Sequence, residues 1–290
     1  MRALALASLI TAAIAISWAS ILILLSGANS ITISFWRLAI ASLALMPLAW
    51  NKLKSIESRA VKWLLISGIG LAVHFVTWIT SLFYTTVAAS TTIVSTYVIF
   101  VLPFTRLAGR REVTRNTVVG TAMALIGVAV IAYGDYGGGW GSVLGDALAM
   151  AGSISGALYF VSGKSAREFM DTASYGVTAY GIGAIIVLLI ALLLHVDVFS
   201  VGIKAWPYIL LLVVGPMLGG HTLINYSIKY YRSVTVATST LIEPIGSTII
   251  AYFLLSQRPP PVSYIGMAIT LASIYIVIKE EIEADRRSSS

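Results

Sequence analysis

Long apolar stretches separated by short polar segments dominate the pattern of this sequence. Each stretch continues for about 18 or more residues with almost no charge, which is long enough to cross a hydrocarbon core of about 30 Å as a helix. A helix also satisfies its own backbone polar groups, as lipid requires. The pattern predicts ten membrane-spanning helices, at residues 3–25, 32–50, 61–83, 85–107, 116–133, 143–163, 173–194, 206–228, 233–255 and 262–279.

A short motif occurs once in each half of the chain. The segment Leu71–Trp78 (LAVHFVTW) in the third predicted helix is matched by Leu218–Asn225 (LGGHTLIN) in the eighth. Each half holds five predicted helices, and because five is odd, the second half enters the bilayer from the opposite side. The sequence therefore predicts an all-α membrane protein of ten transmembrane helices in two inverted five-helix repeats. Such repeats allow a transporter to open alternately to either face.

The repeat defines the predicted organisation of the chain. The first repeat covers residues 1–134 and the second covers residues 142–279. Between them, residues 135–141 form a glycine-rich loop that joins the halves flexibly. Residues 280–290 are charged and rich in serine, and we expect a short solvated tail in the cytoplasm.

The distribution of charge sets the orientation in the membrane. The chain is 58% hydrophobic and 11% charged, with a net charge of +7. Of its 19 basic residues, 16 fall in the loops and tails of one side if the N-terminus is cytoplasmic. This asymmetry follows the positive-inside rule and predicts a multi-pass protein of the cell (inner) membrane with both termini inside. The basicity is explained by topology, so we expect no nucleic-acid partner.

Several segments carry a resemblance to a known family. Gly219–Ile228 (GGHTLINYSI) and Leu241–Gly246 (LIEPIG) resemble the second repeat of EamA-type proteins in the drug/metabolite transporter (DMT) superfamily. Ala72–Leu82 and Ile99–Val101 are similar to the first repeat, and Arg37 lies in the second helix, where that family commonly has an arginine. The resemblance covers essentially the whole chain and implies a ten-helix inner-membrane carrier of small metabolites, often an exporter.

The chain departs from the family pattern mainly at helix ends. Val98 stands where the family often has a proline in the fourth helix. Arg110–Glu112 replaces a Gly-Glu-Arg sequence at the end of that helix, and Ser256–Gln257 replaces Gly-Glu at the end of the ninth. These changes put local salt bridges in question more than the fold.

Ionisable groups inside the predicted helices are candidates for function, because inserting each one costs roughly 2.5–3.5 kcal/mol. Four lie well inside: Arg37, His74, His221 and Glu243. Arg37 is near the outer end of its helix. We expect it to anchor that helix by reaching the interface or pairing with backbone carbonyls, rather than to contact substrate.

The two histidines occupy equivalent places in the two halves. Trp78 follows His74 by one helical turn, and Asn225 follows His221 by one turn, so each pair shares a helix face. We predict that all four side chains line a central substrate-binding cavity. The alternative is that the histidines only form hydrogen bonds between helices.

Glu243 and Pro244 mark the second half as chemically different from the first. Pro244 has no backbone N–H, so it predicts a helix break that frees a carbonyl near the middle of the membrane. The matching place in the fourth helix holds Tyr97, which with Trp18 is predicted to line the cavity. We hypothesise that Glu243, His74 and His221 couple export to a proton; the alternative is that Glu243 ties helices together. Tyr159 and Tyr180 are further lining candidates.

The function predicted from these patterns is secondary transport of a small molecule by alternating access. An amino acid or a similar amphipathic compound is the kind of substrate expected, moved outward across the lipid bilayer. No motif for a cofactor, a metal or a catalytic site occurs, and no enzyme is expected. Two alternatives remain, an intramembrane enzyme that uses Ser155 with a histidine, and a passive channel for a small solute. The sequence does not give the substrate, the direction of net transport, the coupling ion or the oligomeric state.

Overall fold

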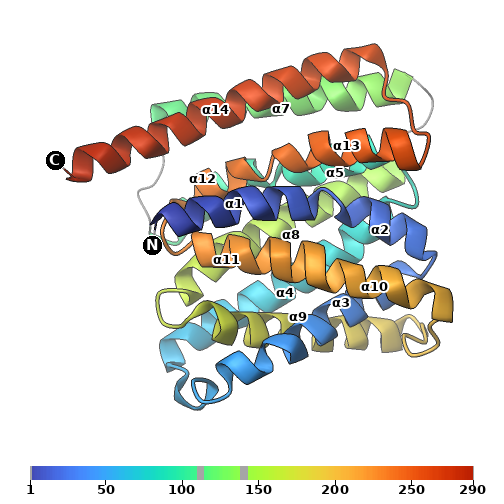
Figure 1. Ribbon diagram of the computed structural model, residues 1–290, viewed down its shortest axis with the longest axis vertical. Helices are drawn as coiled ribbons and strands as arrows, with labels where there is room; N and C mark the ends of the chain where they lie inside the picture. Colours follow the sequence, from blue (N-terminus) through green and yellow to red (C-terminus); the bar gives the residue numbers. More distant parts are fainter. Residues whose placement is uncertain (1, 110–113, 138–142, 290) are drawn as a thin grey trace.

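Helices account for almost all of the described chain in the computed structural model (Figure 1). The structure describes residues 2–109, 114–137 and 143–289, and within these ranges it contains no β-strand. The main helices are α1 (Arg2–Ile16), α2 (Ala19–Ser26), α3 (Ser30–Ala49), α4 (Ser58–Ser81), α5 (Val87–Ser95), α6 (Tyr97–Leu107), α7 (Arg115–Gly137), α8 (Val143–Ala166), α9 (Thr172–Leu193), α10 (Trp206–Leu212), the π-helix η3 (Val213–Thr222), α11 (Leu223–Ser227), α12 (Ser233–Ser239), α13 (Ile242–Leu254) and α14 (Pro261–Ser289).

All ten predicted segments are helical, and eight of them are long and apolar enough to cross a membrane. These eight are Leu4–Ser26, Ser30–Ala49, Ser58–Ser81, Val87–Leu107, Val143–Ala166, Thr172–Leu193, Ile203–Ser227 and Ser233–Leu254. The apolar stretches in α7 and α14 are shorter, Val118–Gly127 and Pro261–Thr270. The chain is therefore an all-helical, multi-pass membrane protein.

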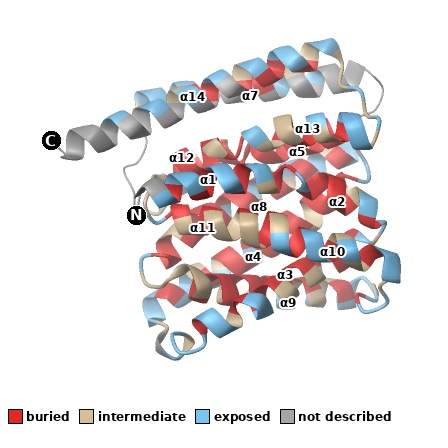
Figure 2. Ribbon diagram, viewed as in Figure 1, coloured by how far each residue is buried: buried red, intermediate tan, exposed pale blue. Residues whose placement is uncertain are grey.

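The outer surface of the bundle is apolar. Large hydrophobic side chains such as Leu43, Leu193 and Phe253 are exposed on it, and Figure 2 shows exposed residues along the outward faces of helices whose inward faces are buried. A soluble protein rarely exposes large apolar patches. These faces fit contact with lipid tails.

Helices from distant parts of the chain pack beside one another in the bundle. The helix α4 packs against α8 and α9, α3 packs against α9, and α1 packs against η3 and α11. The helices α7 and α14 lie side by side along one edge (Figure 1), where they contact α5 and α12. These two helices therefore lie at the periphery of the bundle.

Glycines allow close approach in two helix pairs, α4 with α8 and α7 with α14. A Cβ atom on Gly70 would lie 3.0 Å from the backbone of α8, and one on Gly152 would lie 3.1 Å from Cβ of Trp78. In the edge pair, a Cβ on Gly127 would lie 2.7 Å from the carbonyl oxygen of Gly266. Small residues at helix contacts are a common means of close packing in membranes.

Beyond the tenth predicted span, α14 continues as a helix to Ser289, so the residues expected to form the tail extend that helix. Lys279 and Glu283 form an ion pair of 3.9 Å at i,i+4 spacing, a spacing that supports an exposed helix. Arg110–Glu112 and most of the predicted glycine-rich loop lie outside the described residues.

Candidate functional site

An internal cavity lies where α1 to α6, α8, η3, α11 and α13 converge. Five of the predicted site residues line it: His74, Trp78, Tyr97, His221 and Glu243. The other lining residues are Ile16, Ala19, Arg37, Val94, Gly156, Tyr159, Phe160, Ile224 and Thr240.

The cavity is narrow in this conformation. The space between its lining atoms measures about 490 Å³, but the centre of a water-sized sphere reaches only about 30 Å³ of it. A single water needs about 10–15 Å³ of the volume that the sphere centre can reach. A ligand larger than a few waters therefore requires lining side chains to move.

Two predicted site residues do not line the cavity. Asn225 is buried and donates hydrogen bonds from Nδ2 to the hydroxyls of Tyr159, at 2.6 Å, and Tyr180, at 3.0 Å. Since Tyr159 is a lining residue, Asn225 acts on the cavity by positioning it. Trp18 falls at the break between α1 and α2 and is 42% exposed. Its neighbours Ile16 and Ala19 line the cavity instead.

His74 is held in one orientation by α8. Its Nδ1 is 2.8 Å from the carbonyl oxygen of Gly152. A carbonyl can only accept, so Nδ1 carries the hydrogen and Nε2 of the neutral ring is left as an acceptor. The ring stacks on Trp78, with centroids 5.8 Å apart. A Cβ on Gly156 would lie 2.9 Å from Nδ1, so the absence of a side chain there makes room for the ring.

His221 comes from a stretch of π-helix that the sequence did not predict. The element η3 covers Val213–Thr222 and contains Pro216. The hydroxyl of Thr222 donates to the carbonyl of Met217, five residues earlier, at 3.2 Å. Such wide turns are rare and often occur at functional sites. The His221 ring lies 6.4 Å from that of His74, which brings the two motif histidines together.

The helix containing Glu243 is broken, as Pro244 predicts. The break falls at Thr240 and Leu241, between α12 and α13. Pro244 has no N–H for the carbonyl of Thr240, which instead accepts from the backbone N–H of Glu243 at 2.8 Å. Glu243 thus sits in the first turn of α13, where the helix dipole favours negative charge.

A second break, between α5 and α6, forms without a proline. It falls at Thr96, whose carbonyl accepts from the N–H of Ile99 at 2.9 Å. The Thr96 hydroxyl donates to the carbonyl of Ile93 at 2.7 Å, as the Thr240 hydroxyl donates to its own i−3 carbonyl. If the two breaks are taken as equivalent positions in the two halves, Tyr97 corresponds to Leu241. The sequence comparison instead places Tyr97 at the position equivalent to Glu243.

The two broken helices touch at their breaks. The hydroxyl of Tyr97 forms a hydrogen bond with the hydroxyl of Thr240. Nearby, the hydroxyl of Ser247 donates to that of Thr91 at 3.3 Å. At one end, the side-chain oxygen of Gln257 accepts from the N–H of Val87 at 3.2 Å. Gln257, which departs from the family pattern at the end of the ninth predicted helix, therefore links α5 to the segment after α13.

Arg37 does not have the anchoring contacts expected from the sequence. Its side chain is 0% exposed, and none of its three guanidinium nitrogens has a hydrogen-bond partner among the described residues. Its Cζ lies 4.2 Å from the ring centre of Phe75. The side chain points to the cavity, which could not be predicted from the depth of Arg37 along the helix alone.

Ser155 lacks the contact that a nucleophile would need. Its hydroxyl donates to the backbone carbonyls of Ala151, at 2.7 Å, and Gly152, at 3.2 Å. An activated serine donates to a neighbouring base. In the described residues no hydrogen bond joins Ser155 to His74 or His221.

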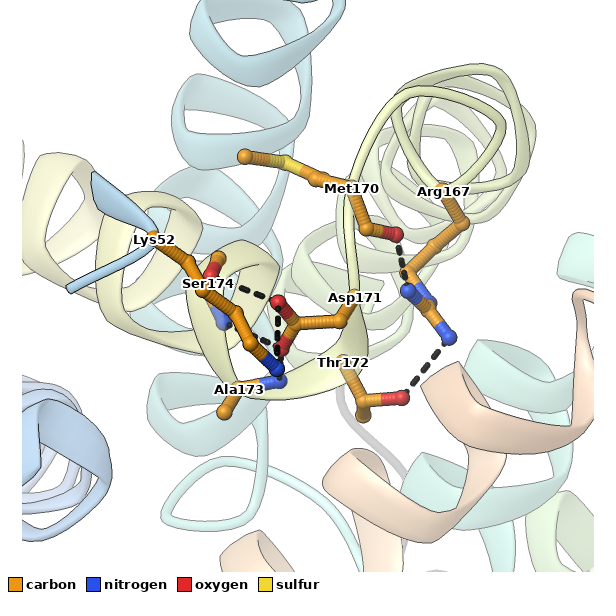
Figure 3. Close-up of polar contacts among 7 residues, drawn as sticks. All are labelled: Lys52, Arg167, Met170, Asp171, Thr172, Ala173 and Ser174. Atoms are coloured by element: carbon orange, nitrogen blue, oxygen red, sulfur yellow. Dashed lines mark hydrogen bonds and ion pairs between the residues drawn. The ribbon is translucent and has the colours of Figure 1, made fainter. Parts of the chain in front are cut away.

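Another polar cluster lies where α8 turns into α9 (Figure 3). Asp171 accepts from the N–H groups of Ala173 and Ser174, at 2.9 and 3.1 Å, and forms a 3.4 Å ion pair with Lys52. Partial burial alone would raise the pKa of Asp171, but the bonds from Ser174 and the charge of Lys52 hold that pKa below its ordinary value. Arg167 donates from Nε to the carbonyl of Asn225 at 3.0 Å. The turn is thereby tied to the helix that positions Tyr159.

Comparison with known proteins gives consistent results over most of the chain. The family model described as the EamA-like transporter family matches residues 1–133 and 143–279. An uncharacterized transporter of Archaeoglobus fulgidus is 26% identical over 278 residues, which cover 94% of this chain and 96% of the relative. An uncharacterized transporter of Clostridium kluyveri is 24% identical over 201 residues, covering 67% of this chain and 62% of the relative.

A solved crystal structure, described only as that of a protein, has a similar fold. It aligns over 100% of both chains with a TM-score of 0.74 and 18% sequence identity. At this identity the likeness extends to the fold alone.

Proposed function

Because this chain belongs to the EamA-like transporter family, we propose that it is a secondary transporter of a small amphipathic metabolite. In this proposal it exports the compound across the cell membrane by alternating access. Ten helices cross the membrane in two inverted repeats, residues 1–134 and 142–279, with both termini in the cytoplasm. The sixteen basic residues on one side of that topology support this orientation.

The observation that carries this proposal is the position of the cavity beside two broken helices in contact. Tyr97 follows one break, Thr240 forms the other, and their hydroxyls are bonded. Discontinuous helices near the midplane are where many carriers hold their substrates. A break also lets the two halves of a helix tilt separately, so the cavity can open towards either side in turn.

The lining suits a ligand with both polar and apolar parts. Trp78, Tyr97 and Phe160 provide aromatic walls, while His221 and Glu243 provide polar groups. Sites with mostly apolar walls and a few polar groups are typical for small molecules.

Counterflow in proteoliposomes tests the proposal. A thermal-shift screen of the purified protein against amino acids and common metabolites first identifies a ligand. Vesicles loaded with that ligand should then accumulate the labelled compound transiently, because a carrier exchanges substrates whereas a channel does not. Absence of both saturation and counterflow would favour a channel.

Variants of the two histidines test the site. We expect the double variant His74→Ala and His221→Ala to lose binding and transport. His74→Asn is a folding control, since its amide N–H can still reach the carbonyl of Gly152. His195→Asn controls for loss of a histidine elsewhere, because His195 is exposed in the loop after α9. Full transport by the double alanine variant would contradict the site assignment.

We further propose that Glu243 carries a coupling proton. It lines the cavity, and its hydrogen bond with Ser247 uses the backbone carbonyl, so among the described residues the carboxylate is left without a hydrogen bond and interacts with Arg37 through charge alone. A carboxyl free of partners in a low-dielectric cavity can exchange a proton between conformations. Export driven by a pH gradient should lose its gradient dependence in Glu243→Gln. Unchanged gradient dependence in that variant would rule out this role.

A further inference from the structure

Arg37 is a buried cation without a bonding partner, beside the cavity. The side chain is 0% exposed, and its Nε, Nη1 and Nη2 atoms all lack hydrogen bonds within the described ranges. Burying an unpaired charge costs free energy, so proteins almost always pair such groups. An unpaired guanidinium that also lines a cavity is a site that lacks its anion.

The position of the guanidinium leaves its donors free. Phe75 stacks against it at 4.2 Å, and this cation–π contact offsets part of the cost of burial. All three guanidinium nitrogens remain without a hydrogen-bond partner among the described residues. The fork of N–H donors at the edge of the guanidinium remains available for a planar, two-oxygen acceptor.

Other groups around the cavity also have unused donors. Among the described residues, the indole N–H of Trp78 is buried without a partner, and so is Nδ1 of His221, which can donate or accept depending on the tautomer. The one acidic lining residue, Glu243, forms no ion pair with Arg37 in the described structure, although its charge is close enough to act on Arg37. In the described lining, Arg37 and Trp78 therefore present unsatisfied N–H donors to the cavity, which favours a ligand with hydrogen-bond acceptors.

We propose that Arg37 is the anion-binding residue of the cavity and that the substrate carries a carboxylate on a small apolar body. This inference rests on the proposed transport function and adds the chemical class of its substrate. A carboxylate accepts two parallel N–H bonds from one guanidinium. A phosphate is disfavoured because Arg37 is the one lysine or arginine among the described residues that line the cavity.

Paired ligands that differ only in the acidic group test this assignment. The probes are benzoate, phenylacetate and 4-methylpentanoate, each compared with its primary amide, in thermal-shift titrations of purified protein in detergent. For the native protein we expect an acid to raise Tm more than its amide. Arg37→Met should weaken acid binding at least about tenfold, and Arg37→Lys should weaken it less, because Lys keeps the charge but loses the planar fork.

The stability of the unliganded variants separates binding from structure. Arg37→Met removes an unpaired buried charge, so its Tm should equal or exceed that of the native protein. Arg167 is the matched control, since it is also buried, at 2% exposure, but donates to Asn225, Met170 and Thr172. Arg167→Met should lower Tm and leave the preference for acid over amide unchanged.

Four results would overturn the proposal. The first is that every acid and its amide change the Tm of the native protein equally, and the second is that Arg37→Met still prefers acids to amides. The third is that Arg37→Met without ligand has a lower Tm than the native protein. The fourth is that phenyl phosphate raises the Tm of the native protein more than benzoate does. These measurements need no membrane, so they are independent of transport. If acids bind through Arg37 but no counterflow occurs, the proposed transport function is wrong and this inference stands. If an amide shows counterflow that Arg37→Met leaves unchanged, this inference is wrong and the transport function stands.

Discussion

Two glycines of α8 determine how His74 sits in the cavity. The carbonyl of Gly152 accepts from Nδ1 at 2.8 Å, and Gly156 is so close that a Cβ there would come within 2.9 Å of the same atom. The bond fixes the tautomer, and the confinement fixes the rotamer. Nε2 is left as an acceptor in a defined place, a useful property in a group that must recognise a ligand.

Substituting Gly156 by alanine should weaken ligand binding while the protein still folds. The added methyl group displaces the His74 ring, and overpacking of this kind typically costs about 1–3 kcal/mol. If about 1.4 kcal/mol of that falls on the bound state, Kd rises about tenfold. Titration of the ligand found by thermal shift measures the change in Kd, and chemical unfolding in detergent measures stability.

Gly215→Ala is the control for this substitution. Gly215 lies on η3, and no atom lies within 4 Å of the place its Cβ would occupy. We expect its Kd to match that of the native protein. If Gly156→Ala bound ligand as well as Gly215→Ala does, confinement of His74 would not matter for recognition.

At the scale of the element, the sequence predicts where helices occur better than how they are distorted. Every predicted span is helical because long apolar stretches have few other options in lipid. The break near Pro244 follows from a missing N–H. The break at Thr96 has no proline to signal it, and the π-helix around Pro216 has a sequence that an ordinary kinked helix would also accommodate. Both depend on packing against neighbouring helices.

The N-terminus of α9 gives a prediction about pH. Asp171 caps this helix, and replacing such a cap by alanine costs about 1 kcal/mol. Because the pKa of Asp171 is lowered in the folded protein, its carboxylate stabilises the fold above its unfolded pKa of about 3.9. This stabilisation is lost as the pH falls through the folded pKa. Asp171→Ala should therefore be less stable than the native protein at pH 7, with the difference shrinking below about pH 4.

Glu57→Ala provides the control at another helix start. Glu57 is the N-cap residue of α4 but forms no side-chain capping bond, so its removal should change stability by less than about 0.5 kcal/mol. Chemical unfolding of the three proteins in detergent at pH 7 and at pH 3.5 measures these differences. Equal stability of Asp171→Ala and the native protein at pH 7 would show that the cap does not stabilise the fold. The ion pair between Asp171 and Lys52 is expected to contribute little, because the Lys52 side chain is 63% exposed.

At the scale of the whole molecule, the arrangement brings together residues that the sequence could only match in pairs. His74 and His221 are in separate halves, yet their rings are 6.4 Å apart. The repeated motif predicted that these positions correspond, because both lie at the same depth in matching helices. It could not predict that Trp18 faces outward or that Arg37 lies unpaired beside the cavity. Those outcomes depend on how each helix is rotated about its axis, which one sequence does not determine.

The number of membrane crossings can be tested directly, because the chain has no cysteine. Asn51 and Ser200 are exposed in loops before α4 and after α9. Between them, α4, α5 with α6, α8 and α9 are long enough to cross, while α7 has the shorter apolar stretch. If α7 also crosses, the five crossings put the two residues on opposite sides of the membrane; if it does not, four crossings put them on the same side.

We expect an impermeant maleimide to label Ser200→Cys in intact cells, and to label Asn51→Cys only after permeabilisation. The unsubstituted chain, which has no thiol, gives the background. Labelling of both positions from one side would show that α7 does not cross, which leaves four crossings in the first half and removes the odd number of helices on which an inverted repeat depends.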